Sequence, residues 1–354
     1  MFSRRSPFRS LTAFALVTAA LVMMVASAGC QKSAPDQGGS AKKREIILAA
    51  YSIPDKAYKK IIPAFQADWK SKTGEDVVVT ESYGGSGAQA RAVIEGLEAD
   101  VVHLAMEPDV NKIQEAGLVD EGWQPRTTGT GIPTTSLIVL GVRPGNPKAI
   151  REWADVSRAG IGVITPDPKT SGGAQWNLLA SWGSVSLTGG TEALAYDQVK
   201  ALYGNAVVLD KSARDASNTF LKKGIGDVAL LWESDANIGK AQGEAFDIVV
   251  PSNTILAETA ATVVDENAKK HGTQDVAKAF VDFLFSPEAQ KAFAETGLRP
   301  VDESVLKEYA GQFPSPSGRL FTIADFDGWK AAKSTYFGEA GVYPKIEAEV
   351  AQKR

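Results

Sequence analysis

Two glycine- and serine-rich stretches contain the residues of this sequence best suited to hold an anion. They are YGGSG at residues 83–87 and TSGGA at residues 170–174. Each stretch follows a short apolar segment and precedes a segment with helical spacing, which places it where a strand passes into a helix. The first N–H groups of a helix have no partner within that helix, and the helix dipole is positive at this end. Two such helix starts that face one another would form a cleft for an anion.

Two further features extend this set of donors. Ser86 is followed three residues later by Gln89, a spacing that predicts a capping box at the start of the first helix. Trp232 ends the apolar run DVALLW, and open α/β sheets bind ligands beyond the carboxyl ends of their strands. The indole N–H of a tryptophan can only donate a hydrogen bond, which suits an anion. We therefore expect Trp232 at the same cleft.

Catalytic side chains are scarce in this chain. Of its two histidines, we expect His103, inside an apolar strand, to be a packing residue and His271 to lie at the surface. Neither has a second histidine or a cysteine nearby, so a nucleophile with its base is not apparent. The acidic residues Asp100, Glu107 and Asp109 have a spacing that suits the ends of a strand and a helix better than a metal site. The sequence favours a binding protein without a metal or cofactor over an enzyme.

Residues 1–29 have the organisation of an export signal. Three arginines precede an apolar run at residues 11–25, and small residues close it at 26–30. The apolar run is shorter than the roughly 20 residues that a membrane span normally needs. We expect this signal to be removed and the rest of the chain to be exported, to the periplasm or the cell envelope.

Cys30 is the only cysteine of the chain, so no intrachain disulfide can form. Two interpretations of it are open. Cleavage before Gly29 would leave an idle thiol, whereas residues 27–30 resemble a bacterial lipobox in which Cys30 becomes the acylated first residue. A polar segment rich in Gly, Ser and Lys follows at 31–44, and it predicts a flexible tether. A solitary cysteine followed by a tether favours the lipid anchor.

The charge of the mature chain argues against nucleic-acid binding. Removing residues 1–29 takes away three arginines and no acidic residue, which changes the formal net charge from −4 to −7. Neither this total nor any run of Lys and Arg offers the basic face that a nucleic acid requires. An acidic protein that binds anions must hold them with oriented dipoles rather than with net charge.

Strands and helices alternate along the mature chain, which predicts an α/β fold with sheets flanked by helices. The first cycle has expected strands at 44–52, 76–82 and 99–105, a turn at 54–55, and expected helices from 58 to about 74, from the first glycine-rich loop to 98, and from 106 to about 117. The second cycle has expected strands at 134–147, 161–165, 206–210 and 227–232 and expected helices at 174–183, 190–203 and 216–223. Return strands at 247–264 and a strongly amphipathic segment at 275–297 follow. Pro63 is expected to kink the first helix or to begin a new turn.

The mature chain is too long for one hydrophobic core. It retains 325 of the 354 residues, and two domains are expected at this length. We expect the chain to cross to a second domain and return, with the ligand cleft between the two. The expected divisions are a signal at 1–29, a tether at 30–44, a first lobe of 45–133 and 255–354, and a second lobe of 134–254.

Four motifs, in this order, resemble those of bacterial sulfate-binding proteins, the substrate receptors of ABC importers. They are SYGGSGAQA at 82–90, GVITPDPKTSGGAQWN at 162–177, VLDKSARDASNTF at 208–220 and GIGDVALLWE at 224–233. The likeness extends from about Glu45 to Trp329 and includes LRP at 298–300 and LFTIADFDGW at 320–329. It implies a two-lobed periplasmic-binding-protein-like fold of type II, with a mixed sheet in each lobe, that closes on a dehydrated oxyanion.

The resemblance also implies a set of ligand donors. The family's main-chain donors fall on Ser86, Gly172, Gly173 and Ala213, its hydroxyl donor on Ser171 and its indole donor on Trp232. One position departs from the family pattern. Where the family often has Tyr-Asp-Pro after the first strand, this chain has Ser52 after Tyr51, which keeps a main-chain N–H but lacks the carboxylate. Arg214 is expected beside the site, where it stabilises the loop without being a ligand.

Three functions remain open from the sequence. The first is a sulfate receptor that delivers its ligand to an ABC permease and works as a monomer. The second is a receptor for thiosulfate or another tetrahedral oxyanion. The third is an exported ester hydrolase, which would need a nucleophile with its base or a metal cluster.

Overall fold

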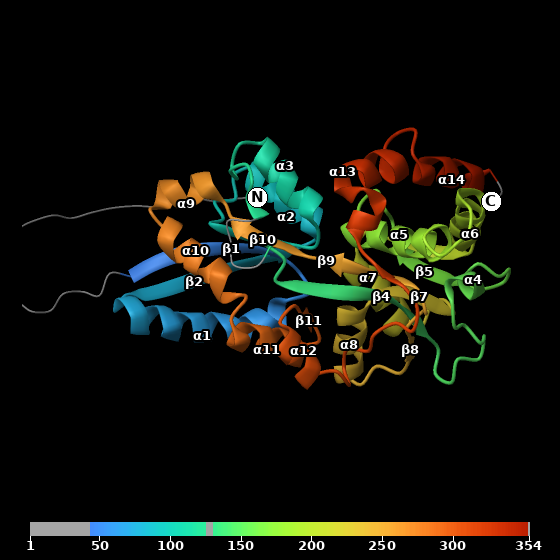
Figure 1. Cartoon of the computed structure of the whole chain (residues 1–354), viewed down its shortest axis with the longest axis horizontal. Coiled ribbons are helices and arrows are strands. Elements are labelled where there is room, and N and C mark those ends of the chain that lie inside the picture. Colours follow the sequence, from blue (N-terminus) through green and yellow to red (C-terminus); the bar gives the residue numbers. More distant parts are fainter. Residues whose placement is uncertain (1–42, 125–129, 353–354) are drawn as a thin grey trace, which may run out of the picture. The chain divides into compact units, whose positions relative to one another are not determined.

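The computed structural model describes residues 43–124 and 130–352, all within one compact unit. The predicted export signal, Cys30 and nearly all of the predicted tether lie outside the described residues. Within the described part of the chain, no helix is long and apolar enough to cross a membrane. The expected α/β class is confirmed, since two mixed sheets are flanked by helices (Figure 1).

The first sheet has four strands in the order β10-β3-β1-β2. Strands β1 (Lys43–Tyr51), β2 (Asp76–Gly84) and β3 (Val101–Leu104) are parallel, and β10 (Ala260–Val263) pairs with β3 in the antiparallel direction. Because β1, β2 and β3 run in the same direction, their carboxyl ends meet at one edge of the sheet. The connections that leave these ends carry Ser52, Gly85 and Ala105.

The second sheet is centred on β4 (Thr134–Val142), of which all nine residues are buried. Its main path has the order β12-β9-β4-β7-β5-β6, and two further short strands pair with β4. The other strands are β5 (Val163–Pro166), β6 (Ala206–Asp210), β7 (Val228–Trp232), β8 (Asp247–Val249), β9 (Thr254–Glu258), β11 (Arg299–Pro300) and β12 (Leu320–Phe321). Strands β5, β6 and β7 are parallel to one another, so their carboxyl ends also share one edge.

Fourteen α-helices are described, and most of them cover the faces of the two sheets (Figure 1). They are α1 (Asp55–Thr73), α2 (Ser86–Ile94), α3 (Glu107–Glu115), α4 (Trp153–Val156), α5 (Gly172–Ser186), α6 (Glu192–Gly204), α7 (Ala213–Leu221), α8 (Glu233–Ala241), α9 (Asp265–His271), α10 (Gln274–Phe283), α11 (Pro287–Glu295), α12 (Glu303–Glu308), α13 (Gly328–Ala332) and α14 (Val342–Ala351). A 3-10 helix at Ile323–Phe326 and a π-helix at Lys333–Phe337 flank α13.

Alternation of apolar residues along the strands builds a core on each face of each sheet. In β1, Leu48 faces a cluster with residues of α1 and α10, whereas the next residue, Ala49, faces a cluster with α2 and α3. In β4, Ile138 packs on the side of α5 and α6, and Val139 packs on the side of α7. The central strands of each sheet are therefore buried on both faces, and their carboxyl ends are the part that reaches the surface of a cleft.

A single residue joins the two sheets where β9 passes into β10. This residue is Thr259, which is buried, and its hydroxyl donates to the carbonyl oxygen of Thr134 at 2.8 Å. The Thr259 Oγ1 also lies 3.0 Å from Nε2 of His103, and Nδ1 of that histidine lies 2.7 Å from the hydroxyl of Tyr58. Burial lowers the pKa of His103 to about 3, so the ring is neutral. The expected packing role of His103 is confirmed.

The C-terminal segment from residue 320 lies against the second sheet and its helices. Strand β12 pairs with β9. Trp329 contacts Trp176 of α5 edge to face at 4.6 Å between ring centroids, and Tyr343 contacts Tyr203 of α6 at 5.1 Å. These aromatic contacts place the segment against helices of the second sheet, whereas the sequence predicted it in the first lobe. The other lobe boundaries stay a prediction.

Several element boundaries differ from expectation for local reasons. Helix α1 continues through Pro63 without a break. The amphipathic segment 275–297 contains most of α10 and all of α11, because Ser286 caps a new helix that begins with Pro287. The second helix of the chain ends at Ile94 and not at residue 98.

His271 ends α9 and contacts two acidic residues, which makes a pH-dependent contribution to stability testable. Its Nδ1 lies 2.8 Å from Asp100 Oδ1 and its Nε2 lies 3.1 Å from Glu98 Oε2. The pKa of His271 is raised above 6.5, chiefly by its hydrogen bond to Asp100. A raised pKa means that the charged ring stabilises the fold fully below the unfolded value, and that this contribution is lost as the pH rises through the folded pKa.

We predict that His271→Gln costs more stability at pH 5.5 than at pH 8.5. Because the side chain is partly exposed, the difference between the two costs should be no more than about 1 kcal/mol. Urea unfolding of the parent and the variant at both pH values measures it. An equal cost at the two pH values would contradict the assignment of the charged ring to this ion pair.

Candidate functional site

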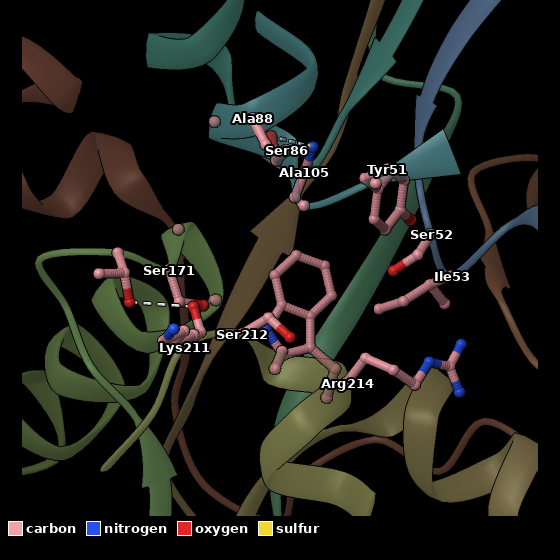
Figure 2. A pocket seen from close by; sticks show the side chains of 18 of the residues that line it. Tyr51, Ser52, Ile53, Ser86, Ala88, Ala105, Ser171, Lys211, Ser212 and Arg214 are labelled. Atoms are coloured by element: carbon pink, nitrogen blue, oxygen red, sulfur yellow. Dashed lines mark hydrogen bonds between the residues drawn. The ribbon is translucent and has the colours of Figure 1, made fainter. Parts of the chain in front are cut away.

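One cavity of about 310 Å³ collects all seven residues proposed as ligand donors from the sequence. They are Ser52, Ser86, Ser171, Gly172, Gly173, Ala213 and Trp232. The cavity lies at the carboxyl ends of strands from both sheets. Figure 2 shows Ser86 and Ala105 on one side of it, Ser171 and Lys211 on a second side and Ser52 on a third.

The start of α2 is held by a buried hydrogen-bond network. The hydroxyl of Ser86 donates to Asp109 Oδ2 at 2.6 Å and accepts from the backbone N–H of Ala105 at 3.0 Å. Asp109 is 3% exposed and also contacts Lys112 Nζ at 2.7 Å. The hydroxyl of Ser86 is therefore fully engaged, and only the backbone N–H of this residue is available to a ligand.

The predicted capping box at Ser86 and Gln89 is wrong. Gly85 is the N-cap residue of α2, and no side chain caps this helix. The side-chain amide of Gln89 instead contacts the hydroxyl of Ser82 at 3.2 to 3.3 Å. Ser86 and Gln89 have the spacing of a capping box, but the Ser86 hydroxyl donates instead to Asp109, which is distant in sequence. The first N–H groups of α2 remain without a side-chain acceptor, which leaves them for a ligand.

The start of α5 presents two glycines and a hydroxyl. Ser171 is the N-cap residue, and its Oγ accepts from the backbone N–H of Ala174 at 3.4 Å. As an acceptor in this cap, the hydroxyl keeps its own hydrogen for donation. Gly172 and Gly173 are the first two residues of the helix, where N–H groups have no intrahelical partner. This loop supplies three donors from consecutive residues.

A third helix start comes from the motif KSARD. Ser212 caps α7, since its Oγ accepts from the N–H of Asp215 at 3.1 Å, and the Ser212 hydroxyl donates to Asp215 Oδ2 at 2.7 Å. Ala213 is the first residue of α7, and it lines the cavity. The expected third helix start is confirmed. The Ser212 hydroxyl is occupied by its cap, so the donor proposed for this helix start is the backbone N–H of Ala213.

Trp232 lies at the carboxyl end of β7, as the sequence predicted. The side chain is 2% exposed, and its indole Nε1 has no hydrogen-bond partner among the described residues. A Cβ atom added to Gly173 would lie 3.1 Å from this nitrogen, so the indole N–H lies beside the start of α5. Leaving a buried donor unpaired costs about 1–3 kcal/mol. A ligand acceptor in the cavity would satisfy it.

The end of β1 contributes Ser52 to the cavity, beside the buried Tyr51. Tyr51 packs edge to face on His103 at 5.2 Å between centroids and lies 6.4 Å from the Trp232 ring. Burial raises the pKa of the Tyr51 phenol well above its usual value. Tyr51 is therefore a neutral wall of the cavity, and sequence reasoning did not assign it a role.

Three cations line the cavity, of which the sequence reasoning named only Arg214. The others are Arg91 of α2 and Lys211 before α7. Arg91 follows Gly87 by four residues, and this helical spacing was the available signal for it. Among the lining residues there is no Asp or Glu. The described lining therefore offers N–H and O–H donors and positive charge, with no carboxylate as an acceptor.

Arg214 lies beside the site, as expected, and pairs with a buried carboxylate. Its Nη1 is 3.3 Å from Asp235 Oδ1, and the Asp235 side chain is fully buried. Burial raises the pKa of Asp235, and the charge of Arg214 opposes this effect. The described residues contain no cluster of three or more His, Cys, Asp or Glu that is arranged to hold a metal ion.

Comparison with known proteins gives concordant findings. The family of bacterial extracellular solute-binding proteins matches residues 46–299. A sulfate-binding protein of Synechococcus elongatus is 43% identical over 351 residues, which cover 99% of this chain and 98% of that protein. A thiosulfate-binding protein of Pseudomonas aeruginosa is 36% identical over 314 residues, which cover 87% of this chain and 94% of that protein.

A solved structure is also similar to this chain. The sulfate-binding protein SubI from Mycobacterium tuberculosis is 38% identical, with a TM-score of 0.74. The match covers 82% of this chain and 98% of that protein. Both the sequence and the fold are thus shared over most of the described residues.

The network at Ser86 gives a prediction about the stability of the site. Ser86→Ala leaves Asp109 Oδ2 and the N–H of Ala105 without this partner in a buried place, which should cost about 1–3 kcal/mol of unfolding free energy. Ser82→Ala, at a half-buried position on the same segment, is the matched control and should cost less than half as much. Urea unfolding at neutral pH measures both. Equal small losses would show that the Ser86 hydroxyl does not hold the loop.

Proposed function

Because the chain belongs to the bacterial extracellular solute-binding proteins, we propose that it is an extracytoplasmic receptor that binds sulfate and delivers it to an ABC permease. Its relatives at 43% and 38% identity are sulfate-binding proteins. The observation that carries the proposal is the buried, unpaired indole N–H of Trp232 beside three helix starts in one cavity. This arrangement suits an anion that can accept hydrogen bonds on every side.

The proposed ligand contacts are all donors. Backbone N–H groups come from Ser52, Ser86, Gly172, Gly173 and Ala213, the hydroxyl from Ser171 and the indole N–H from Trp232. Sulfate at neutral pH carries no proton, so each of its oxygens can accept. Donors fixed by helix starts need no reorganisation when the anion arrives. An acidic chain can bind a dianion in this way because the positive ends of the local dipoles offset the repulsion from its negative net charge.

The protein is a receptor and not an enzyme, in line with its binding-protein relatives. His103 is buried and neutral, with Tyr58 and Thr259 as partners. His271 is the last residue of α9, and its ring nitrogens contact the carboxylates of Glu98 and Asp100. Neither histidine lines the cavity, so neither can act as a general base on the proposed ligand. Incubation with chromogenic sulfate and phosphate esters should release no product.

Thiosulfate is the second candidate ligand, because a thiosulfate-binding protein is 36% identical to this chain. Thiosulfate replaces one oxygen by a larger sulfur that accepts hydrogen bonds weakly. A site with a donor on every side should therefore prefer sulfate. Calorimetric titration with both anions separates the two functions, and a tighter thiosulfate affinity would reverse the assignment.

We also propose the surroundings in which this receptor works. It acts in the periplasm or at the cell envelope as a monomer, held by a lipid at Cys30 after the signal is removed. The partner is the membrane permease of the importer. Intact mass measurement of the protein purified from membranes tests the anchor, because acylation at Cys30 adds the mass of its lipids and an unmodified mature chain would exclude it.

The indole donor gives a quantitative prediction. Trp232→Phe keeps an apolar ring and removes the N–H, and a hydrogen bond to a charged group contributes about 1.5–3 kcal/mol, so sulfate should bind roughly tenfold or more weakly. Trp182→Phe is the matched control, because Trp182 Nε1 is also buried and unpaired but does not line the cavity. Calorimetry should show an unchanged affinity for this control. Parental affinity in Trp232→Phe would reduce Trp232 to a packing residue.

The absence of a carboxylate among the lining residues predicts selectivity against phosphate. Phosphate carries at least one proton near neutral pH, and the described lining has no carboxylate to accept a hydrogen bond from it. Burying an unpaired polar group costs about 1–3 kcal/mol, and a clash of two donors adds to it, so discrimination of roughly 10³-fold or more is expected. Calorimetry from pH 6 to 8 should give tight sulfate binding with little pH dependence. Phosphate binding of similar strength would mean that an acceptor faces the ligand.

A further inference from the structure

Gly172 lies against a methionine that comes from the other sheet. A Cβ atom added to Gly172 would lie 2.3 Å from Sδ and 3.3 Å from Cγ of Met106. Gly172 is helical and its φ is not positive, so its backbone would accept any side chain. Close contact with Met106, and not backbone strain, is therefore what keeps a side chain out at this position.

A second contact joins the same two elements one turn further along α5. Trp176 Nε1 lies 3.4 Å from the carbonyl oxygen of Ala105, the residue before Met106. Trp176 is fully buried, and Met106 is 1% exposed. Residues 105 and 106 connect β3 of the first sheet to α3, whereas α5 covers the second sheet. The contact between Met106 and Gly172 thus bridges the two sheets.

The bridge is also connected to the donors on its own side of the cavity. Asp109, three residues after Met106, accepts from the Ser86 hydroxyl, and the N–H of Ala105 donates to the same hydroxyl. The N–H groups at the start of α5 belong to Gly172 itself and to Gly173. A displacement of Met106 away from Gly172 would therefore move the donors at Ser86 away from those of α5.

We propose that Met106 and Gly172 form a latch that sets how stably the two sheets close over the ligand, an inference that rests on the proposed receptor function. The sulfur fits against the bare Cα of Gly172, which allows the two helix starts to approach closely enough to contact one anion. Met106 and Gly172 are in this respect positioning residues, since they act through the distance between two sets of donors. The contact is lost when the sheets separate, so it stabilises only the closed form.

A double-mutant cycle tests the latch. Gly172→Ala should weaken sulfate binding by roughly tenfold or more, because the added methyl collides with the Met106 sulfur in a tightly packed place. Met106→Ala removes the sulfur and should restore the binding of Gly172→Ala to within about threefold of Met106→Ala alone. Calorimetry with sulfate, and with thiosulfate in parallel, measures all four proteins.

Gly173→Ala is the matched control for the cycle. A Cβ atom there would lie 3.1 Å from Ala213 Cβ of α7 and 3.1 Å from Trp232 Nε1 of β7, and neither residue belongs to the segment that carries Met106. Met106→Ala should not restore the sulfate affinity that Gly173→Ala loses. Thermal unfolding of ligand-free Gly172→Ala should match that of the parent, because a closing defect leaves the fold of each sheet intact.

The outcomes separate the latch from the proposed function. Parental affinity in Gly172→Ala, or a loss that Met106→Ala does not restore, overturns the latch. A parent that binds neither anion contradicts the receptor function. In that case small-angle scattering of the ligand-free proteins tests the contact alone. Gly172→Ala should then have a larger radius of gyration than the parent and than the double variant, and equal radii would overturn the latch.

Discussion

A dehydrated anion needs hydrogen-bond donors on all of its sides, and this constraint accounts for the arrangement of both sheets around the cavity. One strand edge offers donors from only one side. The chain therefore uses the carboxyl ends of strands in two sheets, with Ser86 presented by one and Ser171 by the other. Since the two sheets are joined through the short passage from β9 to β10, the donors converge only where the sheets approach each other. The cavity of about 310 Å³ lies where these donors converge.

The elements behind the donors are organised to keep them in place without competing for the ligand. Two buried carboxylates lie behind the cavity lining, Asp109 beside Lys112 and Asp235 beside Arg214. Asp109 accepts the Ser86 hydroxyl and so orients the start of α2. Neither carboxylate lines the cavity, so neither offers an acceptor to a protonated anion. Acidic side chains thus help to hold a site whose described lining contains no carboxylate.

Local sequence signals were enough to predict which seven of the residues that line the cavity lie together. Glycines and serines at the two strand-to-helix junctions, and Trp232 at a strand end, each followed from short-range rules on helix starts and sheet edges. The fold class followed from the alternation of strands and helices. These features depend on residues within one turn or one strand of each other, which is the range over which a sequence pattern determines structure.

The features that sequence reasoning missed depend on partners that are distant in the chain. Ser86 has the spacing of a capping residue, but Asp109, which follows it by 23 residues, takes its hydroxyl. Trp329 packs on Trp176 of α5, a helix of the second sheet, and no local sequence pattern predicts this contact. The same holds for Gly172, whose lack of a side chain looks like an ordinary feature of a glycine-rich loop. Only the structure places the Met106 sulfur against it, and the proposed latch rests on this contact.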